Sequence, residues 1–502
     1  MQKNRIFWTS LLGACVFLSL VFLISGREPE SHGLGLAIPN PADNAPYIFF
    51  EGEGKFFTLP VPEKIPRELS RARPLIDGLR PVFSLFGKAS ETAVLVSWES
   101  SRLQVAASLL YPGTAMKLLS EGVFPDDWKK AIPSLSMKKT GDGIYEVNYS
   151  SRRLPLFLSV NNKMTFIASS PEMIASMVEV FEKGDGIVQT PWTIEKKWAN
   201  HLRVHDSGLI SRLASLKGYR TPGGKVGLTA AWTGERTKGR MKWKAEGIEG
   251  FFPRELREGF LPVKRDDRFL AFEPFIAGAG IHLPESLSTE VLKMDTDNEI
   301  FPGRMKTEEM GTFLSGPVMG AISGTGKFLI FSLPGFYVQF PGRGEKGEQF
   351  VKSFWDQDWS LLVPDLEPVE GFSSGGTTAI PFSILGAANQ DLVLLGILDR
   401  DNLRSDRRKK LPDAVPLLKE KGTAVFWFHL DGARLGTALA NLAKAGRVAE
   451  RMGRNIGMDL KDILRASEEL KGIGRISVVL PSLDEGILEW RRAPQNRGKQ
   501  AE

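Results

Sequence analysis

The sequence predicts an α+β protein: an N-terminal transmembrane helix followed by two tandem copies of a mostly antiparallel sheet-plus-helices domain. Three observations predict this class. An uncharged apolar run occupies residues 6–24, and a strand–turn–strand–helix segment at 154–177 recurs at 380–403. The expected strands also arrive in adjacent pairs joined by short turns, without regular β-α-β alternation, and this favours antiparallel sheets.

The segment Leu154–Met177 is the clearest local pattern in the chain. It reads as two apolar strands around the polar turn Asn161–Lys163, followed by a helix. Asn tolerates the positive φ that hairpin turns require. Ser170 stands where an N-cap belongs, and Pro171 takes the first helical position. We therefore expect a β-hairpin that leads directly into a capped helix.

A matching segment, Ile380–Leu403, has the same parts, with a turn at Asn389–Asp391 and Asp399 in the cap position. Four further segment pairs keep the same order along the chain. They are Tyr47–Phe50 with Phe269–Phe272, Arg80–Gly113 with Gly316–Gly342, Trp198–Leu216 with Thr423–Leu442, and Gly223–Ala245 with Gly472–Ala493. Five landmarks in one order predict an internal duplication.

The duplication divides the chain into six parts, and 502 residues suit two or three domains. We expect a signal anchor at 1–26, a Gly- and Pro-rich tether at 27–44, a first repeat at 45–246, a linker at 247–266, a second repeat at 267–495 and a basic tail at 496–502. Several strands are apolar throughout, so at least one sheet should be covered on both faces.

The apolar run Ile6–Ile24 would span about 28 Å as a helix, close to the thickness of a hydrocarbon core. Two alternatives stay open: cleavage near Ser25 and Gly26, and lipidation of Cys15, which follows a lipoprotein-like Leu-Gly-Ala. Lys3 and Arg5 precede the run, so the positive-inside rule places the N-terminus in the cytoplasm. The bulk of the chain should then lie outside the cytoplasm, at the inner (cytoplasmic) membrane.

Composition excludes two classes of protein. Hydrophobic residues make up 42% and charged residues 25%, which are globular values and exclude a disordered chain. The net charge of +6 is small for this length, so we expect no nucleic-acid partner. Cys15 is the sole cysteine, so the bulk of the chain is expected to be stable without disulfides.

Three local motifs imitate catalytic or phosphate-binding signatures, and each lacks the structural context that its chemistry needs. Gly371–Gly375 fits a nucleophile elbow around Ser373, but no core strand precedes it and no helix follows. Ser136–Lys139 and Lys139–Gly141 fit penicillin-enzyme motifs that should lie far apart. Gly320–Lys327 resembles a phosphate loop with wrong spacing, and Phe328 replaces the hydroxyl residue after the lysine.

The remaining candidates are also weak, and we predict no catalytic, cofactor-binding or metal-binding residues and no cofactor. His201 and His205 are four apart, a metal-binding spacing on a helix, but the segment reads as a strand. Asp206 and Asp431 occupy equivalent places and are expected to be helix caps. The basic run Arg404–Lys410 should be solvated surface, with anionic lipid headgroups or wall polymers as an alternative partner.

A signal-anchored chain with a duplicated α+β module, including the segment FIASSPEMIASMVEVF, resembles bacterial envelope proteins of unknown function. The resemblance implies a membrane-anchored, extracytoplasmic protein and carries no activity. We expect a non-enzymatic binding or scaffold module, whose partners are the membrane through residues 6–24 and an envelope protein or anionic polymer. Two alternatives remain: an envelope hydrolase or wall-modifying enzyme with a scattered site, and an apolar-ligand-binding protein, suggested by 31 Phe residues.

Overall fold

The computed structural model divides the chain into two compact units. Unit 1 comprises Met1–Arg236 and Met241–Gly250, and unit 2 comprises Thr237–Arg240 and Phe251–Glu502. The structure describes residues 34–41, 45–54, 83–99, 102–132, 134–141, 143–149, 155–161, 164–187, 200–206, 226–235, 238–247, 263–264, 268–284, 315–328, 331–356, 366–378, 383–451 and 460–492.

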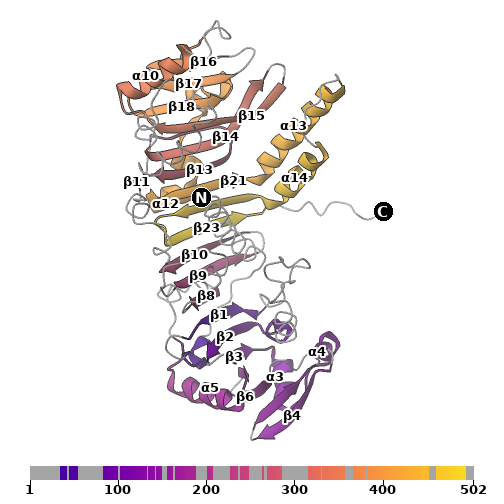
Figure 1. The fold of residues 1–502 in the computed structure, drawn as a ribbon. Coiled ribbons are helices and arrows are strands. Elements are labelled where there is room, and N and C mark those ends of the chain that lie inside the picture. The colour runs from indigo at the N-terminus through magenta and orange to yellow at the C-terminus, as the bar shows by residue number, and fades with distance from the viewer. Residues whose placement is uncertain are drawn as a thin grey trace. The chain divides into compact units, whose positions relative to one another are not determined.

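Unit 1 is built on one antiparallel sheet with helices packed on it (Figure 1). Neighbouring strands pair in the order β10-β9-β8-β1-β2-β3-β7-β6-β5-β4. The elements are η1 (Leu34–Ala37), β1 (Tyr47–Glu53), β2 (Glu91–Glu99), β3 (Arg102–Leu110), α3 (Gly113–Ser120), α4 (Asp126–Ala131), β4 (Ser136–Gly141), β5 (Ile144–Asn148), β6 (Leu156–Asn161), β7 (Met164–Ala168), α5 (Pro171–Lys183), β8 (Asn200–Asp206), β9 (Val226–Glu235) and β10 (Lys238–Glu246).

The central strands of the sheet of unit 1 are buried on both faces. Along β2, Val94 belongs to a core formed with α3 and α4, whereas Ala93 and Leu95 belong to a second core formed with α5 and η1. Successive side chains of a strand point to opposite faces, so a strand covered on both sides is apolar throughout. The expectation of a doubly covered sheet is confirmed.

The segment before β1 packs into this second core. Leu34, Ala37 and Ile38 are buried, although Gly and Pro residues around them resemble a linker. The Ser108 hydroxyl donates to the Leu34 carbonyl at 2.7 Å, and the Ile187 N–H donates to the Ile38 carbonyl at 2.8 Å. Residues 34–38 are therefore an integral part of unit 1, and residues 1–33 lie outside the described part of the chain.

Unit 2 is also built on an antiparallel sheet, and its strands pair in the order β23-β22-β21-β13-β14-β15-β18-β17-β16. The elements are β11 (Val263–Lys264), β12 (Leu270–Phe272), β13 (Phe275–Leu283), β14 (Gly316–Phe328), β15 (Phe331–Pro341), α10 (Glu345–Phe354), β16 (Ser374–Thr377), β17 (Ile384–Ala388), β18 (Leu392–Ile397), η6 (Arg400–Asn402), η7 (Ser405–Arg407), β19 (Arg408–Lys410), α11 (Leu411–Ala414), α12 (Pro416–Lys421), β20 (Thr423–Ala424), β21 (Phe426–Asp431), α13 (Gly432–Arg451), α14 (Leu460–Ile473), β22 (Arg475–Leu480) and β23 (Glu485–Arg491).

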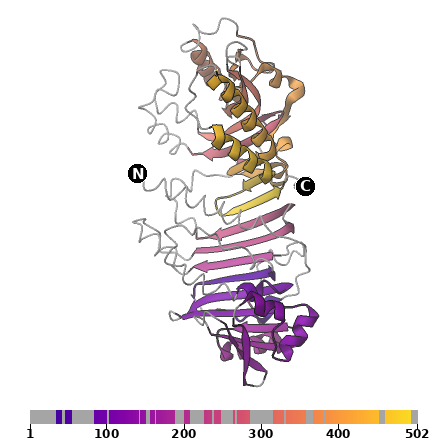
Figure 2. The same cartoon turned by 90° about the vertical axis from the view of Figure 1, so that its right-hand side faces the viewer.

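One face of this sheet is fully covered. The segments around β12, α11 and α12 pack over Met319, Tyr337 and Leu394 and form the larger core of unit 2. On the opposite face, α10 covers β17 and β18 with Phe350 and Val351. Helices α13 and α14 lie side by side, and α13 contacts β15 and β13 (Figure 2).

The predicted fold class is wrong. The prediction was an α+β protein with an N-terminal transmembrane helix and two sheet-plus-helices domains. In the structure, 47% of the described residues are in strands and 31% are in helices, and the strands form large antiparallel sheets. The physical reason is that strands far apart in sequence, such as β1 and β8, pair with each other. Adjacent pairs that looked like small separate hairpins therefore join one extended sheet in each unit.

Within the described residues, no helix is both long enough and apolar enough to cross a membrane. Residues 6–24, where the transmembrane helix was expected, lie outside these ranges. The prediction that Phe269–Phe272 in the second repeat corresponds to Tyr47–Phe50 in the first is wrong. Tyr47–Phe50 belongs to β1, which pairs with β2 in the large sheet, whereas β12 pairs with β19 in a separate two-stranded sheet. It is β13, the next strand, that pairs with β14 in the large sheet. The predicted domain boundaries and duplication stay predictions.

The hairpin-and-helix prediction at 154–177 is confirmed. Strands β6 and β7 pair around residues 162–163, and α5 begins directly after them. The Ser170 hydroxyl accepts the Met173 N–H at 3.2 Å, and Gly184 ends the helix with a φ of 72°. In the second segment, Asn389 accepts the N–H groups of Asp391 and Leu392, but Asp399 makes no capping bond and instead pairs with Lys327.

We predict that Ile38→Ala destabilises the protein by about 2–4 kcal/mol, because it removes a fully buried side chain from the core of unit 1. The matched control is Leu36→Ala two residues away, where the side chain is 44% exposed and the change should stay within about 0.5 kcal/mol. Urea denaturation of residues 28–502 measures both. Equal effects at the two positions would show that residues 34–38 are not packed as described.

Candidate functional site

Two features of unit 2 stand out from its core: a partly exposed apolar surface on the sheet, and a charged cluster at the start of α13. The surface consists of two rows of cross-strand neighbours, which lie on one face because directly paired residues share a face. We call it the apolar face: Leu430, Ala277, Ile322, Phe336 and Ile397 in one row, and Phe428, Ala279, Gly320, Val338 and Leu395 in the other.

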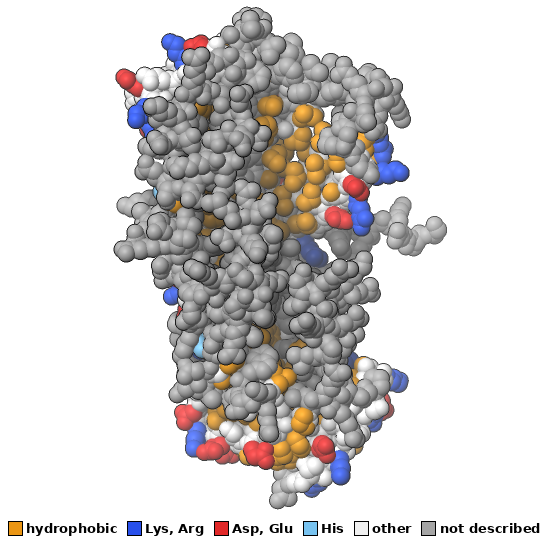
Figure 3. Space-filling view, viewed as in Figure 1, with side chains coloured by type: hydrophobic (Ala, Val, Ile, Leu, Met, Phe, Trp, Pro, Cys, Tyr) orange, Lys and Arg blue, Asp and Glu red, His pale blue; other side chains and the backbone are white. Residues whose placement is uncertain are grey.

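Phe336 lies near the middle of the apolar face and is 48% exposed, whereas most of its neighbours are half-buried. Figure 3 shows hydrophobic side chains gathered in this region of unit 2, over β14, β15 and α13. Gly320 has no side chain in the second row, and a Cβ added there would meet no heavy atom of the described residues within 4 Å, so the space above it is open. The apolar face therefore combines an exposed aromatic ring with a neighbouring position where the backbone is uncovered.

Helix α13 borders this surface with an apolar stripe. Leu435, Leu439 and Leu442 are spaced at i, i+4 and i+7, so they lie on one side of the helix, and all three are half-buried. The opposite side carries the exposed polar residues Thr437, Asn441 and Lys444. Because α13 packs on β15 and β13, its apolar side faces the sheet.

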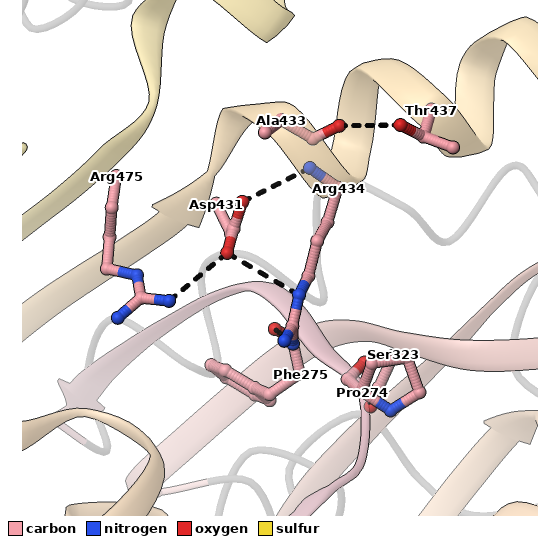
Figure 4. Close-up of polar contacts among 8 residues, drawn as sticks. All are labelled: Pro274, Phe275, Ser323, Asp431, Ala433, Arg434, Thr437 and Arg475. Carbon is pink, nitrogen blue, oxygen red and sulfur yellow. Dashed lines mark hydrogen bonds and ion pairs between the residues drawn. The ribbon is translucent and has the colours of Figure 1, made fainter. Parts of the chain in front are cut away.

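The charged cluster centres on Asp431, the last residue of β21 (Figure 4). Its carboxylate accepts the Arg434 N–H at 3.1 Å and thereby caps α13, as predicted. The second oxygen faces Arg475 at 3.3 Å and the Arg434 side chain at 3.6 Å. Arg434 also donates to the Phe275 carbonyl of β13 at 3.4 Å. The cluster thus joins β13, β21, β22 and the first turn of α13.

A buried serine–histidine pair lies beside this cluster. His429 Nδ1 is 2.8 Å from the Ser477 hydroxyl on the neighbouring strand β22, and the Phe275 ring centroid is 5.7 Å from the imidazole. Burial is the main cause that lowers the pKa of His429, to about 4; the positive charges of Arg475 and Arg434 act in the same direction, and the carboxylate of Asp431 opposes them. The imidazole is therefore neutral at pH 7.

The pair has the residue types of a nucleophile and its base, but its surroundings do not suit catalysis. Ser477 and His429 are only 6% and 3% exposed, so a substrate carbonyl has no direct approach to the hydroxyl. Asp431, the nearest carboxylate, is engaged by the cap and by two arginines. The arrangement is that of a satisfied buried hydrogen bond between neighbouring strands.

The structure separates the residues of the local motifs. Ser373 precedes the short strand β16, and its hydroxyl donates to Glu348 at 2.5 Å, without a helix behind it. Lys327 lies within β14, which leads into another strand, and its ammonium is 3.5 Å from Asp399. Lys138 and Lys139 are exposed on the hairpin strand β4. None of these three sites gains a catalytic partner among the described residues.

The histidine and aspartate candidates of unit 1 are placed as follows. His201 and His205 both lie on β8, as the strand reading predicts; His201 is buried, and His205 stacks on Tyr47 with 5.4 Å between ring centroids. Within the described ranges, no group of three His, Cys, Asp or Glu side chains is placed to hold a metal ion. Asp206 ends β8, and the helix that it was expected to cap lies outside the described residues.

The basic run Arg404–Lys410 takes part in the fold of unit 2. Arg408 donates to the carbonyls of Leu403 and Glu370, and Lys409 pairs with Glu273 at 2.7 Å. β19, which contains the end of the run, pairs with β12. Arg408 and Lys409 therefore already have partners within unit 2, which leaves fewer positive charges of this run for lipid headgroups or polymers.

Sequence reasoning missed Ser477 and Arg475 and left His429 without a partner. His429 and Ser477 are 48 residues apart, and neither lies in a local motif. The available signal was the pair of expected strands 423–431 and 472–480: if they are antiparallel neighbours, the polar residues within them face each other.

Comparisons with known proteins identify no family. No family model matches the sequence, and no curated protein is significantly similar to it. Among solved structures, crystal forms I, III and IV of a protein named TP0453 align over 44% of this chain and 79–81% of theirs, with 10–12% identity and a TM-score of 0.24. At these values the likeness supports no inference about fold or function.

We predict that Asp431→Ala lowers the free energy of unfolding by about 1–2 kcal/mol, because α13 loses its cap and two arginines lose their partner. Asp431→Asn keeps a capping oxygen and should lose less than half of that. Ser373→Ala and His205→Ala should change stability by less than about 0.5 kcal/mol. Thermal unfolding of residues 28–502 measures all four, and no difference between Ala and Asn at 431 would contradict the capping role.

Proposed function

We propose that this chain is a non-enzymatic binding protein of the bacterial envelope, held at the cytoplasmic membrane by residues 6–24, with the apolar face of unit 2 as its binding surface. The observation that carries the proposal is the exposure of Phe336 beside the open position at Gly320. An exposed aromatic ring amid half-buried aliphatic side chains is typical of surfaces that bind a partner.

The favoured partner is an envelope protein that covers the apolar face. Aromatic residues near the centre of an interface supply much of its binding energy, because they bury a large apolar area with few rotatable bonds. Phe336 has this position, with Ile322 and Ile397 on either side across the strands. An apolar side chain from the partner would pack over the uncovered backbone at Gly320.

A small apolar ligand is the second candidate, and it would occupy the open space above Gly320 beside the Phe336 ring. The two candidates differ in what they require of that position. A side chain introduced by Gly320→Val should exclude a small ligand, whereas it adds apolar area to a surface that a protein covers. The conformation of Gly320 does not require a glycine, so this change is compatible with the strand.

A hydrolase remains a third reading, and Ser477 with His429 would be its site. Esterase turnover of the wild type and of Ser477→Ala decides it: a hydrolase loses turnover in the variant, whereas a binding protein shows none in either. Burial of both side chains makes this reading the weakest of the three.

The proposed location rests on the charge pattern around residues 6–24 and on the packing of residues 34–38. Only residues 27–33 separate the apolar run and its Ser25-Gly26 end from the buried Leu34. Seven residues reach about 25 Å when fully extended. In this arrangement unit 1 stays close to the outer surface of the membrane.

We predict that Phe336→Ser abolishes most partner capture when residues 28–502 are used as bait in envelope extracts. Its matched control is Leu366→Ser, also in unit 2 and 41% exposed but away from the apolar face, which should capture normally. Both changes should lower the melting temperature by similar, small amounts, because the two side chains are about equally exposed. Equal capture by the two variants would remove the apolar face from the proposal.

We also predict that a reporter enzyme active only in the periplasm works when it is fused after Glu502 in a Gram-negative host. The mature protein should still begin at or near Met1. An inactive fusion would contradict the location, and a mature N-terminus after Gly26 would contradict the anchor while leaving the location intact.

A further inference from the structure

The junction between β21 and α13 contains two arginine side chains beside the carboxylate that caps the helix, whereas capping itself requires only the carboxylate. Asp431 is 9% exposed and is shared by two guanidinium groups, from Arg434 on α13 and Arg475 on β22. Arg434 reaches across to the Phe275 carbonyl, so the same side chain ties the first turn of α13 to β13. The attachment of that turn therefore depends on how one carboxylate is shared.

His429 lies two residues before Asp431 on the same face of β21, and it is buried beside this arrangement. The Ser477 hydroxyl on β22 and the Phe275 ring on β13 contact the imidazole, and the charges of Arg475 on β22, Asp431 on β21 and Arg434 on α13 act on it. Helix α12 also packs on β22, and it carries the charged residues Lys419, Glu420 and Lys421. The charges that shift the pKa of His429 are, by contrast, those of Arg475, Asp431 and Arg434.

We propose that the contacts of Asp431 with Arg434 and Arg475 form an acid-sensitive latch, which holds the first turn of α13 on the sheet while the neighbouring His429 is neutral and releases that turn when His429 gains a proton. A proton on the imidazole places a third positive charge beside two guanidinium groups that share one carboxylate. The imidazolium competes for Asp431 and repels Arg434. Opening the turn moves Arg434 away and lets water reach the imidazole.

Linkage fixes the direction and the pH window. The pKa of His429 is about 4 in the folded protein and about 6.5 in water, so the closed turn binds fewer protons than the open one. Closure is therefore fully favoured above pH 6.5 and weakens as the pH falls from 6.5 toward 4. Each pH unit within this window raises the opening constant by up to about tenfold.

The consequence for the proposed function is regulation of the same surface. Helix α13 borders the apolar face, so release of its first turn enlarges the exposed apolar area at low pH. This consequence rests on the proposed function, whereas the latch itself does not.

Hydrogen exchange of the full-length chain in mild detergent tests the latch. After correction for the intrinsic rate, the amides of 434–440 should exchange on the order of 50-fold faster at pH 4.5 than at pH 7.5. His429→Gln should abolish this pH dependence. His282→Gln on β13 is the control, because burial alone lowers the pKa of His282, and it should behave as the wild type.

Arg475→Gln tests the mechanism if the His429 variant folds poorly. It removes one of the two repelling charges, so the rise in exchange should be smaller than in the wild type. An equal rise in wild type and His429→Gln, no rise in the wild type, or a rise spread evenly over β13, β14 and β15 would each overturn the latch. Partner capture at pH 7.5 is unaffected by any of these outcomes, so failure of the latch and failure of the proposed function are distinguishable.

Discussion

The structure of each unit depends on one constraint: a sheet whose strands are apolar on both faces must be covered on both faces. Unit 1 meets this constraint with α5 and η1 on one side and with α3 and α4 on the other. The segment that contains η1 has the Gly and Pro content of a linker, yet it covers part of the sheet. It is ordered because Leu34 and Ile38 bury their side chains against that sheet.

In unit 2 the same constraint is met on one face and only in part on the other. The segments between β18 and β21 seal the face that contains Tyr337, and α10 covers β17 and β18 on the opposite side. Phe336 lies on the same face as the area that α10 covers and remains 48% exposed. Among the described residues it is the most exposed large hydrophobic side chain, and it therefore indicates best where the protein meets something else.

Local signals in the sequence predicted local structure well. Ser170, Pro171 and Gly184 define α5 through rules that involve only neighbouring residues, and Asp431 caps α13 in the same way. Features that depend on distant pairing were not predictable. The row that joins Ile322, Phe336 and Ile397 requires the register of three strands, and the His429–Ser477 bond joins strands separated by two helices. Asp399 had the cap pattern, but Lys327 from a distant strand attracts its carboxylate.

The most direct test of this account is photo-crosslinking from the apolar face in living cells. A benzophenone amino acid placed at position 336 of the full-length chain should crosslink to one extracytoplasmic protein of the envelope. The same group at position 366, on an exposed residue of unit 2 outside the apolar face, should give no such product. Equal crosslinking from both positions, or a cytoplasmic protein captured at 336, would contradict the proposal that this surface is an envelope-facing binding site.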